Sequence, residues 1–126
     1  MNLKLPFYIH KVGAGFPSPA TDYIEDDVDL NVHLINNPPA TFIIRVQGKS
    51  MTDVGIYDGD LLVVDRSINP KNSSTVIANV NEELVVKTFI KVGNNNYLAS
   101  GQNKIELSEN PNVIIWGVVT YVIHKL

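Results

Sequence analysis

The chain has 126 residues, of which 44% are apolar and 18% are charged, a composition typical of a folded globular domain rather than a disordered segment. Its formal net charge is −3, which argues against a protein that coats nucleic acid, because phosphate binding requires a concentrated basic surface. The absence of cysteine excludes disulfides, zinc sites built on cysteine pairs and a cysteine nucleophile.

Residues 1–20 are expected to form an extended arm. Within it, the segment 12–19 reads Val-Gly-Ala-Gly-Phe-Pro-Ser-Pro and combines two glycines with two prolines. Glycine lets a chain approach another surface closely, and proline prevents helix formation and favours an extended conformation in the residue before it. Such a peptide is suited to lie in a cleft, and a plain linker is the alternative.

Residues 21–37 are the only helical candidate, because apolar residues recur there at roughly helical spacing. Asp29 or Asn31 is suited to cap a short helix that runs to Ile35, and the sequence Asn-Asn-Pro-Pro at 36–39 ends it. We therefore expect an arm over residues 1–20 followed by one domain over residues 21–126.

From residue 41 onward the pattern is that of β-strands. Runs rich in Val, Ile, Thr and Tyr are separated by turn signals that contain Gly, Pro or Asn. These runs cover residues 41–47, 61–65, 75–80, 84–91, 96–99 and 113–123. Many short strands at this spacing favour a closed or coiled antiparallel sheet, so the predicted fold class is mainly β with at most one short helix.

Two residues carry the candidate chemistry. Ser50 lies in a loop after the strand run at 41–47, and Lys87 lies inside the run 84–90, which has apolar residues on both faces. Burying an ammonium is costly and favours the neutral amine, a general base that activates a serine within its reach. The pair predicts a Ser/Lys hydrolase, a variant of the serine triad. Taken singly, Ser50 is typical of a turn serine, and Lys87 of a strand lysine that extends its ammonium to water.

The other polar residues and the apolar pattern give weaker indications. His10, His33 and His124 lack the spacing of metal ligands, so we expect no metal and no cofactor. Four aspartates between residues 53 and 65 suggest a cation site, but Asp60 and Asp65 bracket a strand for which we expect alternating exposure. No apolar stretch approaches the ~18 residues of a membrane span, and the N-terminus lacks a signal-peptide pattern, so we expect a cytoplasmic protein.

Several short motifs, in order and at matching separations, resemble the LexA/UmuD family of self-cleaving Ser/Lys proteins. The segments 48–51 (Gly-Lys-Ser-Met) and 58–65 (Asp-Gly-Asp-Leu-Leu-Val-Val-Asp) resemble the family's nucleophile region. The segment 85–87 (Val-Val-Lys) resembles its lysine strand, which follows Ser50 at a spacing of 37 residues. Ala14-Gly15 followed by Phe-Pro-Ser-Pro-Ala resembles the cleavage site of the shorter, UmuD-type branch, and the resemblance covers about residues 13–123.

The resemblance implies a fold like that of the LexA C-terminal domain and signal peptidase, and a role in the SOS response. Ser50 and Lys87 would hydrolyse the chain's own Ala14–Gly15 bond. The N–H groups of Ser50 and Met51 would stabilise the oxyanion, and Met51 either lines the pocket for Ala14 or packs in the core. A RecA filament on single-stranded DNA would stimulate cleavage. The shortened homodimer would then serve an error-prone, UmuC-like translesion DNA polymerase, without a membrane or sequence-specific DNA contacts.

Three alternatives remain open. A LexA-like repressor fragment or a phage-type regulator needs a DNA-binding segment, and we see no helix-turn-helix pattern ahead of residue 41. An inert β domain that only binds partners is disfavoured by the intact Ala14–Gly15 site. A signal-peptidase-like enzyme that cleaves other chains needs a membrane anchor, for which no apolar stretch is long enough.

Overall fold

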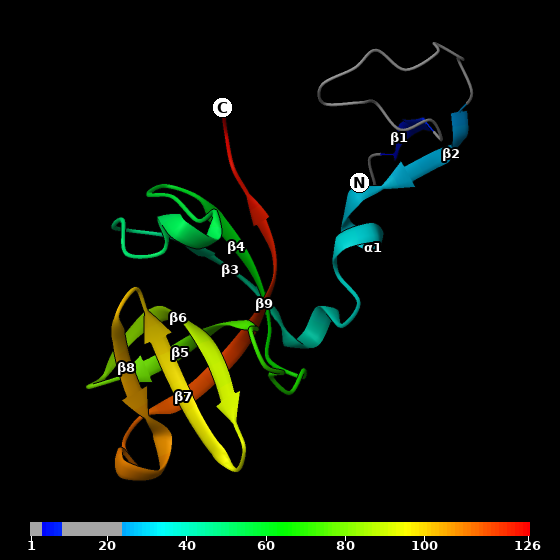
Figure 1. Ribbon diagram of the computed structural model, residues 1–126. Coiled ribbons are helices and arrows are strands. Elements are labelled where there is room, and N and C mark those ends of the chain that lie inside the picture. Colours follow the sequence, from blue (N-terminus) through cyan, green and yellow to red (C-terminus); the bar gives the residue numbers. More distant parts are fainter. Residues whose placement is uncertain (1–3, 9–23) are drawn as a thin grey trace. The chain divides into compact units, whose positions relative to one another are not determined.

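A computed structural model of the chain describes residues 4–8 and 24–126. The chain comprises two compact units, residues 1–36 and residues 37–126, whose elements are labelled in Figure 1. Within the described part, no helix is long and apolar enough to cross a membrane. The predicted cleavage site, Ala14–Gly15, lies outside the described residues, as does most of the predicted arm.

The first unit contains an antiparallel strand pair and one short helix. Strand β1 (Lys4–Tyr8) pairs with strand β2 (Ile24–Asp29), and helix α1 (Leu30–Leu34) follows directly. The side chain of Asp29 caps α1 by accepting a hydrogen bond from the N–H of Asn31 at 3.0 Å. The predicted cap and the predicted end at Ile35 are therefore confirmed.

The sequence did not predict the two strands of this unit. Strand β1 lies within residues 1–20, which were expected to form an extended arm, and β2 lies in the stretch 21–37, where only a short helix capped by Asp29 or Asn31 was expected. The apolar spacing of residues 24–29 is outweighed by backbone pairing with β1, and this stretch is rich in aspartate, which favours helices weakly. Because β1 and β2 are separated along the chain, no local sequence pattern predicts that they pair.

The second unit is built on one seven-stranded antiparallel sheet in the order β3-β4-β9-β5-β6-β7-β8. Its strands are β3 (Thr41–Arg45), β4 (Leu61–Asp65), β5 (Thr75–Val80), β6 (Glu83–Val92), β7 (Asn95–Ser100), β8 (Asn103–Glu106) and β9 (Ile114–Ile123). Three short 3-10 helices, η1 (Pro38–Ala40), η2 (Thr52–Val54) and η3 (Leu107–Glu109), complete it. The mainly β fold class is confirmed. Only β8 was not predicted, because it is a short and mostly polar edge strand.

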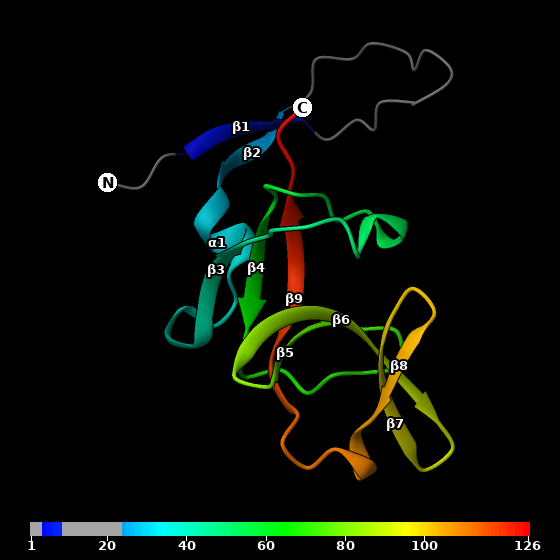
Figure 2. The ribbon, with the colours of Figure 1, turned by 90° about the vertical axis from the view of Figure 1, so that its left-hand side faces the viewer.

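Strand β9 makes the sheet coil. Its first half pairs with β5 and its second half pairs with β4, and each pairing contains one irregularity. In Figure 2, β4 runs beside β9 while β6 arches across the lower part of the same strand. Gly117 lies at the change of partner, where a Cβ atom would stand 2.6 Å from Val64 Cγ1. A side chain at this position would therefore push apart the strands that meet there.

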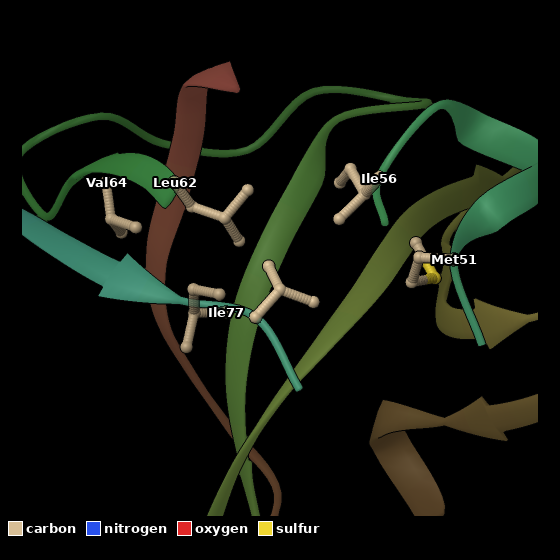
Figure 3. Packing of buried hydrophobic residues seen from close by; sticks show 6 residues of the cluster. Met51, Ile56, Leu62, Val64 and Ile77 are labelled. Carbon is tan, nitrogen blue, oxygen red and sulfur yellow. The ribbon is translucent and has the colours of Figure 1, made fainter. Parts of the chain in front are cut away.

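Two clusters of buried side chains form the core. The first contains Val46, Met51, Ile56, Leu62, Val64 and Ile77, most of which are drawn in Figure 3, and the second contains Val76, Ala78, Phe89, Leu98 and Val118. The neighbours Val76 and Ile77 belong to different clusters, because successive side chains of a strand point to opposite faces. The coiled sheet therefore buries both faces of its central strands.

This double burial corrects the prediction for the strand at 61–65. Both Asp60 and Asp65 are buried, and β4 between them shows no alternation in exposure. The carboxylate of Asp65 accepts hydrogen bonds from the Ser67 hydroxyl at 2.6 Å, from the Ser67 N–H at 2.8 Å and from Asn37 at 3.2 Å. These bonds, led by the Ser67 hydroxyl, lower the pKa of Asp65 from its ordinary value.

Candidate functional site

A cavity of about 350 Å³ lies between the loop after β3 and the first half of β6. Both predicted catalytic residues, Ser50 and Lys87, line it, although they stand 37 residues apart in the sequence. The rest of its wall combines apolar side chains with the polar residues Arg45 and Gln47. The lining residues are Ile44, Arg45, Val46, Gln47, Gly48, Ser50, Met51, Ile77, Leu84, Val85, Val86 and Lys87.

The loop that carries Ser50, residues 46–60, is closed at its base by a pair of backbone hydrogen bonds. The N–H of Val46 donates to the carbonyl of Asp60 at 2.8 Å, and the N–H of Gly59 donates to the carbonyl of Val46 at 2.9 Å. Nearer the tip, the N–H of Gly48 donates to the Asp58 carboxylate at 2.8 Å. Gly48 has φ +102°, a conformation that favours glycine. Gly55 and Gly59 of the same loop also have positive φ, so the loop conformation is set by individual bonds and by glycines in special backbone conformations.

Met51 anchors the loop from within. Its side chain is 3% exposed and packs in the first core cluster near Ile56 (Figure 3). Its carbonyl accepts hydrogen bonds from the N–H groups of Val54 and Ile56, each at 3.2 Å. Met51 also lines the cavity, so the same side chain packs in the core and forms part of the cavity wall. Its neighbour Ser50 is exposed, held at the surface by a buried residue.

Lys87 is placed by the regular ladder of β6. It lies opposite Val76 of β5 and is half-buried. The preceding residues, Val85 and Val86, pack against the second and the first core cluster respectively, which confirms that apolar residues occupy both faces of this strand. Lys87 therefore follows two residues that pack in hydrocarbon on opposite faces of the strand.

The first half of β6 also has a free edge. Residues 83–88 pair with β5, whereas pairing with β7 begins only at Thr88 and continues to Val92. Among the described residues, nothing pairs with the outer edge of residues 83–87, which borders the cavity. Unpaired strand edges offer backbone donors and acceptors to an extended peptide.

Ser100 is a residue that the sequence reasoning missed. Its hydroxyl donates to the carbonyl of Ser50 at 3.3 Å, and its side chain is 8% exposed. It ends β7, one residue beyond the strand run that the sequence predicted at 96–99. The contact joins residues 50 positions apart, and no local pattern predicts it.

Asp60 and His124 form a second contact to the loop. Nδ1 of His124 lies 2.6 Å from Oδ1 of Asp60, whose other carboxylate oxygen accepts the N–H of Tyr57 at 2.8 Å. The His124 ring also packs against the Tyr57 ring at a tilt of 47°, with 5.4 Å between centroids. The hydrogen bond from His124, followed by that from Tyr57, lowers the pKa of Asp60. The loop end is thus tied to the segment after β9.

The aspartates do not come together as metal ligands. Among the residues that the structure describes, no group of three or more His, Asp or Glu side chains is arranged to hold a metal ion. Asp58 and Asp60 instead accept hydrogen bonds within the loop, and Asp65 does so at the other end of β4.

The chain is similar to a known family and to several known proteins. Residues 6–120 match the family model described as Peptidase S24-like. The chain is 41% identical over 128 residues to protein ImpA of Salmonella typhimurium, with 95% of this chain and 83% of ImpA covered. It is 38% identical over 122 residues to protein MucA of Escherichia coli, with 94% and 83% covered. It is 40% identical over 104 residues to the LexA repressor of Photorhabdus laumondii, with 82% of this chain and 47% of that repressor covered.

Proposed function

The chain belongs to the Peptidase S24-like family, and on that premise we propose that it is a self-cleaving serine peptidase of the SOS response. Its substrate is its own Ala14–Gly15 bond, with Ser50 as nucleophile and Lys87 as general base. The observation that carries this proposal is the shared cavity, into which the fold brings a loop serine and a strand lysine. The free edge of β6 beside them suits an extended peptide such as the arm.

The proposed reaction follows from the chemistry of these groups. The neutral amine of Lys87 accepts the proton of the Ser50 hydroxyl, and Ser50 Oγ attacks the carbonyl carbon of Ala14. The N–H groups of Ser50 and Met51 stabilise the oxyanion, and neither donates a hydrogen bond to another described residue. Lys87 then gives its proton to the leaving amine of Gly15. Water hydrolyses the acyl-enzyme and releases residues 1–14.

Cleavage of an attached arm needs control, because a tethered substrate is present at high effective concentration. We propose that the arm is mostly undocked and that a partner favouring the docked form accelerates cleavage. The resemblance to the LexA/UmuD family implies that this partner is a RecA filament on single-stranded DNA. The shortened chain then acts in the cytoplasm as a homodimeric accessory subunit of an error-prone translesion DNA polymerase.

Self-cleavage is tested by incubating the purified full chain at a series of pH values from neutral to alkaline and measuring the fragment masses by mass spectrometry. We expect one cut, at Ala14–Gly15, and a rate that rises with pH because Lys87 must lose its proton. Ser50→Ala and Lys87→Ala should abolish the cut while the chain stays folded. Lys91→Ala is the matched control, because Lys91 lies on the same strand but does not line the cavity. A cut elsewhere, or cleavage by either dyad variant, would contradict the proposal.

A further inference from the structure

We propose that Ser100 is a positioning residue for this reaction, whose hydroxyl aims the N–H of Met51 at the oxyanion. The inference rests on the proposed function, since it assigns a role within the same site. It starts from one contact, in which the Ser100 hydroxyl donates to the Ser50 carbonyl at 3.3 Å. The Ser100 hydroxyl, on strand β7, thus bonds to the backbone of the predicted nucleophile, which lies in the loop after β3.

The donor is held rigidly. Ser100 is the last residue of β7, it is 8% exposed, and it follows Leu98 and Ala99, which are buried in the sheet. A side chain fixed in this way has little freedom to leave its acceptor. The Ser50 carbonyl is therefore held on the side of the loop that faces the end of β7.

The geometry of the peptide unit means that the position of the Ser50 carbonyl sets the direction of the Met51 N–H. The carbonyl of Ser50 and the N–H of Met51 belong to one planar peptide unit, and in a trans unit these two groups point in opposite directions. Fixing the oxygen on the Ser100 side therefore fixes the hydrogen on the other side. The Met51 side chain, buried in the first core cluster, holds the other end of the same unit. Within the described residues this N–H donates no hydrogen bond, so it is available to an oxyanion.

The same contact relates the nucleophile to the base. Thr88 of β6 pairs with Ala99 of β7. Lys87 directly precedes Thr88, and Ser100 directly follows Ala99. Ser100, which bonds to the Ser50 carbonyl, thus lies on β7, and Lys87 lies on the neighbouring strand β6. Both residues are adjacent to the first residue pair that joins these two strands. Ser100 consequently ties a loop of individually bonded residues to the ladder that places the general base.

The test compares Ser100→Ala with Ser100→Thr, which keeps a hydroxyl. Ser108→Ala is the matched control, because its hydroxyl is exposed and donates to the Glu106 carboxylate at 3.2 Å. Two rates are measured on the full chain, namely self-cleavage and the modification of Ser50 by a small fluorophosphonate. That reagent forms an O–P bond with loss of fluoride, and its phosphoryl oxygen uses the oxyanion donors without needing the arm. We expect Ser100→Ala to lower both rates by roughly tenfold, within the ~100-fold or more that removing a whole donor costs. Ser100→Thr should recover most of the loss, and Ser108→Ala should show none.

The outcomes separate this inference from the proposed function. If wild type neither cleaves itself nor reacts with the fluorophosphonate at Ser50, the proposed function fails. If wild type reacts and Ser100→Ala reacts equally fast, only the role of Ser100 is overturned. A loss confined to self-cleavage would place Ser100 in arm docking and also overturn the inference. The inference is also overturned if Ser100→Thr reacts as slowly as Ser100→Ala although its melting temperature shows that it is folded.

Discussion

The two walls of the cavity are held in different ways. Lys87 sits in the ladder of β6, where pairing with β5 and two hydrophobic clusters fix its position. Ser50 sits in a loop whose shape depends on separate hydrogen bonds. Gly48 bonds to Asp58, Val46 bonds to Asp60 at the loop base, and Ser100 bonds to Ser50 itself. A ladder shares a perturbation among many bonds, whereas a loop held by single contacts loses its shape when one is removed.

This difference indicates which changes will harm the fold and which will harm only the proposed chemistry. Changes in the sheet around Lys87 should lower the stability of the whole domain, because its strands share one core. Changes in the contacts of residues 46–60 should slow cleavage while leaving the fold largely intact. The predictions below test that separation, beginning with the largest expected effect.

The largest effect is expected for Gly117→Ala in the sheet. The new Cβ would stand 2.6 Å from Val64 Cγ1, and Val64 is fully buried. Overpacking of this kind typically costs about 2 kcal/mol of unfolding free energy. Denaturant unfolding measures it. Gly93→Ala is the control, since Gly93 has open space but a φ of +60°, so it should lose only about 1 kcal/mol from backbone strain. Equal losses in the two variants would show that the close contact at Gly117 is not the cause.

The second prediction separates the two ends of β4. Asp60 and Asp65 both have a lowered pKa in the folded state, so each stabilises the fold above the unfolded value of about 3.9. That stabilisation is lost as pH falls through the lower, folded pKa. Asp60→Asn and Asp65→Asn should therefore each be less stable than wild type at pH 5, and both differences should shrink below about pH 4. Acid-series unfolding measures the effect.

Only one of these two variants should slow self-cleavage. Asp60 closes the loop that carries Ser50, whereas Asp65 bonds to Ser67 and Asn37 at the other end of the strand. We expect Asp60→Asn to slow cleavage by roughly tenfold, because a misplacement of about 1 Å can cost ~100-fold. Asp65→Asn should cleave at the wild-type rate once it is folded. Equal slowing in both would mean that stability, and not loop position, limits the reaction.

The sequence predicted what is local and missed what depends on distant pairing. The strand runs and the apolar setting of Lys87 follow from short runs of β-favouring residues and from turn residues, which act over a few positions. Strand β1 and β2 were missed because their stability comes from each other. The burial of Asp60 and the contact of Ser100 were missed for the same reason, since their partners lie 64 and 50 residues away. The candidate pair of Ser50 and Lys87 was predicted from the apolar run around Lys87 together with the family motifs, not from periodicity.

The smallest effect is expected at the turn that joins β5 to β6. Asn81 and Glu82 have φ of +52° and +68°, and such two-residue turns favour Asn followed by Gly. A glutamate in this conformation is strained, so Glu82→Gly should stabilise the domain by about 0.5 kcal/mol, after the higher entropy of glycine in the unfolded chain is included. Asn81→Gly is the control and should gain less, because asparagine tolerates this conformation. The rate of self-cleavage should not change, since the ladder between this turn and Lys87 is unaltered. A changed rate would mean that Lys87 is held less firmly by its strand than Ser50 is by its loop.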